Sequence, residues 1–431
     1  MSRAARLPDR ERHPPIMKYR HSAAALAATA VVFASAGSAV AATPSPTPSV
    51  AIPDGLYGTT DPTYDGVWRQ SLALLAQNTT GVTPADSAVA WLAGQQCANG
   101  AFAAFRADTG KPCAADLMVD TNSTAAAVQA LAALGGHDAG VKKAVTWLKS
   151  VQNADGGWGY TPGGATDTNS TSVVAGALAQ AGVTVPNLRK GGKSPYDALQ
   201  KLALPCTGKD AGAFAYQPDK KGELAANADA TAAAVLGLLD EPLTGSRQDD
   251  DASATGCTTF DAGTEPEKGG HNGAVWLAEA LADNGRLMSS LPGAEDQPDY
   301  GNTADAIVAL SSAGFNDQAA APLRWLEDNS AQWAAQSGPA AYAQLIFVAN
   351  AAKGADVHDF GGQDLVELLN ATGPAPRGID EPTRTDAIGK AEEKKDDDGG
   401  LNVAYTVAGG LVVGALVGFV LVARGRKRRQ A

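Results

Sequence analysis

The sequence predicts an all-α protein, an (α/α)6 toroid with an inner and an outer ring of helices, followed by one C-terminal transmembrane helix. Three observations support this prediction. Two kinds of helix-forming strip alternate along the chain, no convincing segment with a strand period competes with them, and a long apolar run lies near the C-terminus. These features divide the 431 residues into one globular part and several flanking segments.

The N-terminal segment has the features of a secretory signal. Residues 17–42 start with basic residues, continue as an apolar run and end in a small-residue cleavage site. Met17 stands directly before the signal, so we expect it to be the true start and residues 1–16 to be an upstream extension. An uncleaved anchor is the alternative. Residues 43–59 form a Pro/Ser/Thr-rich linker, which extends and does not pack.

The globular part, residues 60–372, repeats one strip in which Asp, Asn and Thr precede small apolar residues. The copies are DTNSTAAAVQAL at 120–131, DTNSTSVVAGAL at 167–178, NADATAAAVLGL at 227–238 and DYGNTADAIVAL at 299–310. Helices that are apolar on all sides must be buried, whereas the strips that alternate with them are amphipathic and need one wet face. The alternation therefore predicts inner and outer helices.

The spacing of the strips predicts six pairs, enough to close a ring. Inner helices are expected to begin near residues 64, 121, 168, 228, 301 and 338. Outer helices are expected to begin near residues 84, 138, 194, 270, 317 and 361. An open solenoid built from the same pairs is the alternative.

Four cysteines in the exported part predict two disulfides, because the even number fits an oxidising compartment. Three pairings are open. We favour Cys97–Cys113 with Cys206–Cys257, since each bridge would then close one long loop between helices. Histidine is scarce and no C-x-x-C occurs, so neither a metal site nor a cofactor is predicted.

The C-terminal segments predict a single-pass membrane anchor. Residues 373–400 form an acidic stalk, and residues 401–423 contain an uncharged apolar run that as a helix would span about 30 Å, the thickness of a bilayer core. The basic tail at 424–431 should stay in the cytoplasm, which leaves the globular part outside the plasma membrane. Three glycines at four-residue spacing offer a face for a homodimer: Gly410, Gly414 and Gly418.

The segment QNADGGWG at 152–159 resembles the Gln/Trp repeat of the prenyltransferase and squalene–hopene cyclase superfamily. The resemblance covers about residues 60–370 and implies the α/α toroid. Single toroids of this kind also occur in the cobalamin carriers transcobalamin and intrinsic factor. The resemblance therefore implies cobalamin as a candidate ligand. Those carriers close over it with a β-rich domain that is missing here, so a transporter or second binding protein would have to supply that half.

The motifs that would imply catalysis in this superfamily are missing. The cyclase acid Asp-x-Asp-Asp has its nearest counterpart at 248–251, which lacks the first Asp, and neither the Asp-x-Cys zinc pair nor the thioester string Cys-Gly-Glu-Gln occurs. We therefore predict no catalytic residue. An enzyme acting on glycan or isoprenoid stays an alternative, because the repeated acids could supply carboxylate pairs about 5–10 Å apart.

The inner helices of a closed toroid run in one direction, so their N-termini gather at one mouth. Asp, Asn and Thr cap helix N-termini, and a carboxylate has acceptor capacity beyond its cap, so the roles of cap and ligand contact both stay open. The polar residues of this candidate rim are Asp120, Asn122, Asp167, Asn169, Asn227, Asp229, Asp299 and Asn302. The aromatic residues expected to wall it are Phe102, Trp158, Tyr160, Phe214, Tyr216 and Tyr300.

The net charge of −12, with no basic stripe before the C-terminal tail, argues against nucleic acid as a partner. Topology and rim together predict a membrane-anchored, extracellular binding module that captures a small nutrient such as a corrinoid. The alternatives are the toroidal enzyme and a structural or adhesive surface protein.

Overall fold

The computed structural model describes residues 51–249, 251–252, 256–289 and 297–378. The predicted upstream extension, signal peptide, transmembrane helix with its glycine face, and basic tail all lie outside these residues. None of the helices in the described part combines the length and the apolar character that crossing a bilayer requires.

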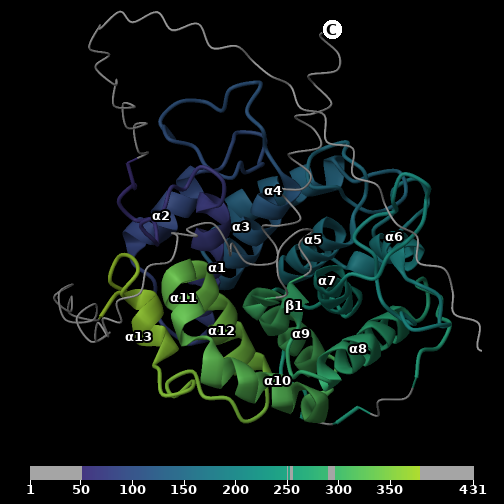
Figure 1. The fold of residues 1–431 in the computed structure, drawn as a ribbon. Helices are drawn as coiled ribbons and strands as arrows, with labels where there is room; N and C mark the ends of the chain where they lie inside the picture. Colours follow the sequence, from purple (N-terminus) through teal and green to yellow (C-terminus); the bar gives the residue numbers. More distant parts are fainter. Residues whose placement is uncertain (1–50, 250, 253–255, 290–296, 379–431) are drawn as a thin grey trace, which may run out of the picture. The chain divides into compact units, whose positions relative to one another are not determined.

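The described residues confirm the all-α class. Six helices contact one another in a closed cycle, each touching the next and the last touching the first (Figure 1). In order around the cycle they are α1 (Gly66–Thr79), α3 (Thr121–Leu134), α5 (Thr168–Gln180), α7 (Ala228–Leu238), α9 (Tyr300–Ser312) and α12 (Pro339–Ala351). They are the six predicted inner helices, and each begins within two residues of its predicted start.

A second set of helices packs against the first, one on each member of the cycle. These are α2 (Asp86–Gly94), α4 (Asp138–Ser150), α6 (Pro195–Leu202), α8 (Pro266–Ala282), α10 (Asn316–Asn329) and α13 (Leu365–Asn370). The sequence did not predict the remaining elements of the described part: a 3₁₀ turn at Val185–Asn187, α11 (Ala331–Ser337), and the antiparallel strands β1 (Met288–Ser289) and β2 (Gln297–Pro298).

Small side chains allow the helices of the cycle to approach closely. Ala125, Ala126 and Ala127 of α3 are completely buried. A Cβ placed on Gly237 of α7 would lie 2.7 Å from the side chain of Ser172 on α5, a distance that real contacts do not reach. The Ala- and Gly-rich strips are therefore required by the spacing of these helices, in addition to their helix propensity.

A Gly-x-apolar element recurs before four helices of the cycle and fixes where each begins. The glycine has a positive φ, and the apolar residue is buried. The apolar residue's N–H donates to the hydroxyl of a Thr in the first turn of the helix, and its carbonyl accepts from the N–H of the cap residue. The pairs are Gly100 with Phe102, Gly156 with Trp158, Gly212 with Phe214 and Gly285 with Leu287.

Replacing Gly156 with Ala should lower the free energy of unfolding by about 2–3 kcal/mol. The φ of Gly156 is +94°, and a Cβ there would lie 2.1 Å from the carbonyl oxygen of Ser194, the cap of α6. Urea denaturation of the full-length protein measures the effect. Gly163→Ala is the matched control: its φ is +74° but nothing lies within 4 Å, so we expect a loss of only about 1 kcal/mol. Equal losses in both variants would contradict this packing role.

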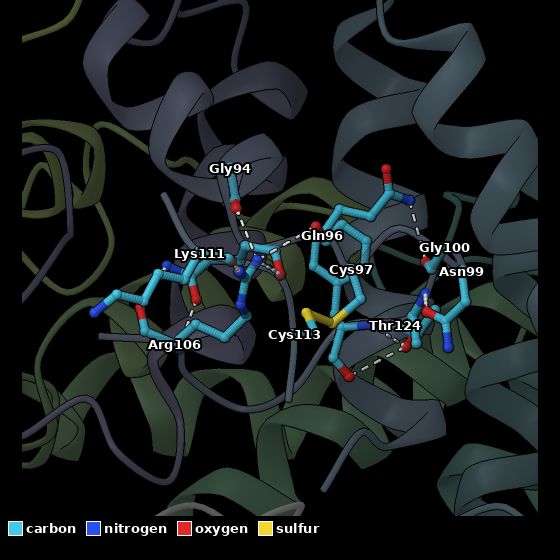
Figure 2. Close-up of a disulfide and its surroundings, with 12 residues drawn as sticks. Gly94, Gln96, Cys97, Asn99, Gly100, Arg106, Lys111, Cys113 and Thr124 are labelled. Carbon is cyan, nitrogen blue, oxygen red and sulfur yellow. Dashed lines mark hydrogen bonds between the residues drawn. A yellow bond between two sulfur atoms is a disulfide. The ribbon is translucent and has the colours of Figure 1, made fainter. Parts of the chain in front are cut away.

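The predicted disulfide pairing is confirmed. Cys97 bonds to Cys113, and Cys206 bonds to Cys257. Figure 2 shows the first bridge with Arg106, a buried residue of the loop that the bridge closes. The Arg106 guanidinium donates to the carbonyl oxygens of Gly94, Gln95, Gln96 and Lys111. It thereby satisfies carbonyl groups at the C-terminal end of α2, where a positive charge is favoured.

Candidate functional site

The repeated Asp and Asn residues cap the helices of the cycle. The side chains of Asp120, Asp167, Asn227 and Asp299 each accept a hydrogen bond from the backbone N–H three residues later. The distances are 2.6 Å at Ser123, 2.7 Å at Ser170, 2.7 Å at Ala230 and 3.0 Å at Asn302. Each cap satisfies one of the N–H groups that a helix start leaves without an intrahelical partner.

Two of these cap residues, Asp120 and Asp167, have carboxyl groups with raised pKa values, which capping alone does not require. Burial raises the pKa of Asp120 to about 6 and that of Asp167 to about 7, against the opposing effect of the N–H groups of Ser123 and Ser170. Asp167 is 1% exposed, and its Oδ2 is buried without a hydrogen-bond partner among the described residues. An isolated cap could be a neutral Asn or Ser, so this retained carboxyl group is a feature that the cap alone does not explain.

A cavity of about 40 Å³ lies among α3, α5, α7, α9 and the segment after α7. We call it the axial cavity. Its polar lining consists of Gln129, Asn169, Ser172, Asp229, Glu241 and Asp305. Its apolar lining consists of Val173, Ala232, Ala233, Leu236, Leu243 and Val308. The cavity is small beside the ~300–1,000 Å³ of pockets that enclose a drug-sized ligand.

The polar lining leaves acceptors without donors. Asn169 donates from Nδ2 to Asp229 Oδ2 at 2.8 Å, which fixes the orientation of the amide and leaves Asn169 Oδ1 buried with no partner. Asp305 Oδ1 accepts from Gln344 Nε2 at 3.1 Å, whereas Asp305 Oδ2 is buried and accepts nothing. Buried polar atoms in folded proteins are nearly always hydrogen-bonded, so two unpartnered acceptors around one cavity call for an explanation.

Burial and nearby negative charges raise the pKa values of the carboxyl groups that line the axial cavity. Burial raises the pKa of Asp229 well above its ordinary value, and the charges of Asp305, Asp299 and Asp167 raise it further. Burial, followed by the charge of Asp299, raises the pKa of Asp305 to about 7. Burial also raises the pKa of Glu241, which the hydroxyl of Ser246 opposes. The carboxyl groups of the cavity can therefore hold protons near neutral pH and release them to the solvent when a cation binds.

Two of the predicted rim tyrosines lie beside these acids. Burial and then the charge of Asp120 raise the pKa of Tyr160, and burial followed by the charges of Asp167 and Asp229 raises that of Tyr216. The backbone carbonyls of Tyr160 and Tyr216 accept from the first N–H of α3 and of α5. Both tyrosines lie two residues after the apolar position of a Gly-x-apolar element. This shared position explains why their carbonyls make equivalent hydrogen bonds to the first residues of α3 and α5.

The other predicted rim aromatics lie elsewhere. Phe102, Trp158 and Phe214 are completely buried in the core, so the expectation that they wall a rim is wrong. Trp158 Nε1 donates to the carbonyl of Leu148 on α4 at 2.8 Å. The Tyr300 ring stacks between Trp325 and Trp333 at centroid distances of 5.0 Å and 5.6 Å.

Of the predicted polar rim, only Asn169 and Asp229 line the axial cavity. The other six predicted rim residues do not line this cavity: Asp120, Asn122, Asp167, Asn227, Asp299 and Asn302. Sequence reasoning missed Asp305 and Gln129. A signal for Asp305 existed: the fourth copy of the strip has Asp where the first three have Ala126, Val173 and Ala233. An acid that replaces a small or apolar residue in a buried helix marks a site, because an unpaired buried charge is costly.

Among the residues that the structure describes, no three His, Cys, Asp or Glu side chains come together in a way that could hold a metal. The lining pairs carboxyl groups with an amide and an apolar wall instead.

Comparison with known proteins confirms the resemblance to the cyclase superfamily over part of the chain. Residues 118–204 match the family model of the squalene-hopene cyclase C-terminal domain. A crystal structure of a protein from Actinoplanes is similar at 17% identity, with 64% of this chain and 75% of that chain covered and a TM-score of 0.40. None of the curated proteins matches the chain significantly.

Proposed function

We propose that the closed cycle of helices is a single (α/α)6 toroid that binds a small ligand at its axial cavity, on a chain anchored at the cell surface. The observation that carries this proposal is the pair of unpartnered buried acceptors, Asn169 Oδ1 and Asp305 Oδ2, beside the carboxyl group of Asp229 in the lining of the same cavity. A ligand that brings hydrogen-bond donors would satisfy these acceptors.

The size of the axial cavity limits what such a ligand can insert. About 40 Å³ admits a group of a few heavy atoms. A corrinoid, the ligand that the family resemblance implies, would therefore lie across the mouth and reach inward with an amide side chain. The toroidal enzyme is less well supported, since the sequence lacks the cyclase acid, the zinc pair and the thioester string.

Calorimetric titration of the full-length protein tests the proposal with three kinds of donor: cobinamide for amides, maltotriose for hydroxyls and n-butylammonium chloride for ammonium. We expect at least one of them to bind, and Asp229→Asn to weaken its binding at least about tenfold, since a hydrogen bond to a charged group contributes about 1.5–3 kcal/mol. Glu279→Gln is the matched control, because it removes one negative charge from an exposed residue on α8.

Two results would count against the proposal: no heat with any of the three probes, or binding that Asp229→Asn leaves unchanged. Binding of cobinamide alone would identify the corrinoid as the ligand class. The cell-surface location has its own test, since protease added to intact cells should cut the acidic stalk at 373–400 and release the globular part.

A further inference from the structure

The acceptors of the axial cavity come from three helices and converge on one small volume. Asn169 lies on α5, Asp229 on α7 and Asp305 on α9. Asn169 is 5% exposed, its Oδ1 is buried without a hydrogen-bond partner among the described residues, and the residue lines the cavity. The hydrogen bond from Asn169 Nδ2 to Asp229 fixes which of its two amide atoms is left over, and that atom is an acceptor.

The described lining supplies negative charge and no positive charge. Asp229, Asp305 and Glu241 line the cavity, and none of the described lining residues is basic. Asp167 and Asp299 lie near enough to Asp229 for their charges to act on it. A neutral donor would leave these carboxylates uncompensated, whereas a cation would offset them, because opposite charges attract strongly where water is excluded.

The rest of the lining is apolar and narrow. Val173, Leu236, Leu243 and Val308 lie around the same volume as the acids. The backbone N–H of Leu243 donates to Gln129 Oε1 at 2.8 Å, and Gln129 Nε2 donates to the carbonyl of Val173 at 3.2 Å, so Gln129 fixes two parts of the apolar wall. A ligand must therefore combine a charged head with a slim hydrocarbon body. Among the described residues, no three His, Cys, Asp or Glu side chains come together in a way that could hold a metal ion.

From these three features we infer that the axial cavity binds a primary alkylammonium group, with its N–H donors on Asn169, Asp229 and Asp305 and its alkyl chain against the apolar wall. The inference rests on the proposed function and names its ligand class. An ammonium group carries three donors and one positive charge, which matches three acceptors on three helices. The group belongs either to a free amine or to a lysine side chain of a partner.

The protonation of the lining makes this binding depend on pH. The acidic and phenolic side chains around the cavity are Asp167, Asp229, Glu241, Asp299, Asp305 and Tyr216. Asp305, with a pKa of about 7, is mostly protonated at about pH 6 and mostly ionised at about pH 8. An alkylammonium stays charged over this range, because its pKa resembles the value of about 10.4 for Lys. Its affinity should therefore rise with pH, by about tenfold from pH 6 to pH 8 for one carboxyl group.

The test is calorimetric titration of the full-length protein with n-butylammonium chloride at about pH 6 and about pH 8. We expect about tenfold tighter binding at the higher pH, and none from n-butanol, which lacks the charge, or from tetramethylammonium, which lacks N–H donors. Asp305→Asn should weaken binding at pH 8 at least about tenfold and remove the pH dependence. The variant keeps the acceptor for Gln344, and Glu279→Gln should change neither quantity.

The outcomes separate this inference from the function on which it rests. Cobinamide or maltotriose binding that depends on Asp229, without n-butylammonium binding, would overturn the inference and keep the function. If none of the three probes binds, both the inference and the proposed function are overturned. Equal affinity at the two pH values would also overturn the inference, and this measurement needs no variant. Binding of Nα-acetyl-lysine methylamide more tightly than n-butylammonium would assign the group to a lysine side chain of a partner.

Discussion

Trp158→Ala should lower the free energy of unfolding by about 3–5 kcal/mol, the range for removing a fully buried aromatic side chain from a core. The Trp158 side chain is completely buried. Its indole N–H donates to the carbonyl of Leu148, while its backbone N–H and carbonyl join the first turn of α5. The substitution thus creates a cavity and removes the hydrogen bond that joins the loop before α5 to Leu148 of α4. Urea denaturation of the full-length protein measures the loss.

Trp158→Phe is the matched control. It keeps an aromatic ring in the core but leaves the carbonyl of Leu148 without its indole donor, so we expect a loss of about 1–3 kcal/mol. If Trp158→Ala cost less than about 1 kcal/mol and instead weakened ligand binding, Trp158 would be a rim residue after all. The magnitude of the loss therefore distinguishes a core position from a binding position.

Helix starts were predictable from the sequence because one local signal fixes them. The strip that begins at Asp120 recurs at Asp167, Asn227 and Asp299, and each first residue is an N-cap in the structure. A cap needs only residues within one turn of itself, so its evidence is complete in the sequence. The cysteine pairing was favoured because each bridge was expected to close one loop; Cys97–Cys113 does so, whereas the segment between Cys206 and Cys257 contains α7.

The cavity was not predictable, because its lining is a long-range property. Gln129 and Leu243 are 114 residues apart in sequence, and their hydrogen bond shapes the apolar wall. In the sequence, Asn169 looks like one more capping residue of the strip that begins at Asp167. In the structure its side-chain amide instead donates to Asp229 on α7, the next helix of the cycle. The direction in which a side chain points around a ring depends on how neighbouring helices are rotated, and local spacing carries little of that information.

The same limit explains the aromatic residues. Trp158 and Tyr160 are close in sequence and belong to one loop, but only the first is completely buried. The Gly-x-apolar pattern could have separated them. The φ of +94° at Gly156 turns the chain against α6, and the residue two positions later then enters the core. Aromatic residues at that position pack in the core, whereas those two positions further on lie beside the acids.

Asp167→Asn should stabilise the protein above neutral pH, by about 2–4 kcal/mol at about pH 8. Asp167 has a pKa of about 7 in the folded protein, against an ordinary value of 3.8, because its carboxyl group is buried. The folded state binds this proton more tightly than the unfolded chain does. The contribution of Asp167 to the free energy of unfolding therefore falls as the pH rises from about 4 to about 7, and it stays low above that range. Asparagine does not ionise and keeps the oxygen that accepts from Ser170.

The measurement is urea denaturation of both proteins at about pH 4 and about pH 8. The two proteins should be nearly equally stable at the acidic pH, where Asp167 is protonated in the folded state, and differ at the alkaline pH. Glu279→Gln removes a charge from an exposed position and should show no such change. A destabilised variant at both pH values would mean that Asp167 Oδ2 has a stabilising partner. A gain at alkaline pH would show that a buried carboxyl group is kept at the N-cap of α5 at the expense of stability, as expected where a carboxyl group is retained for ligand binding.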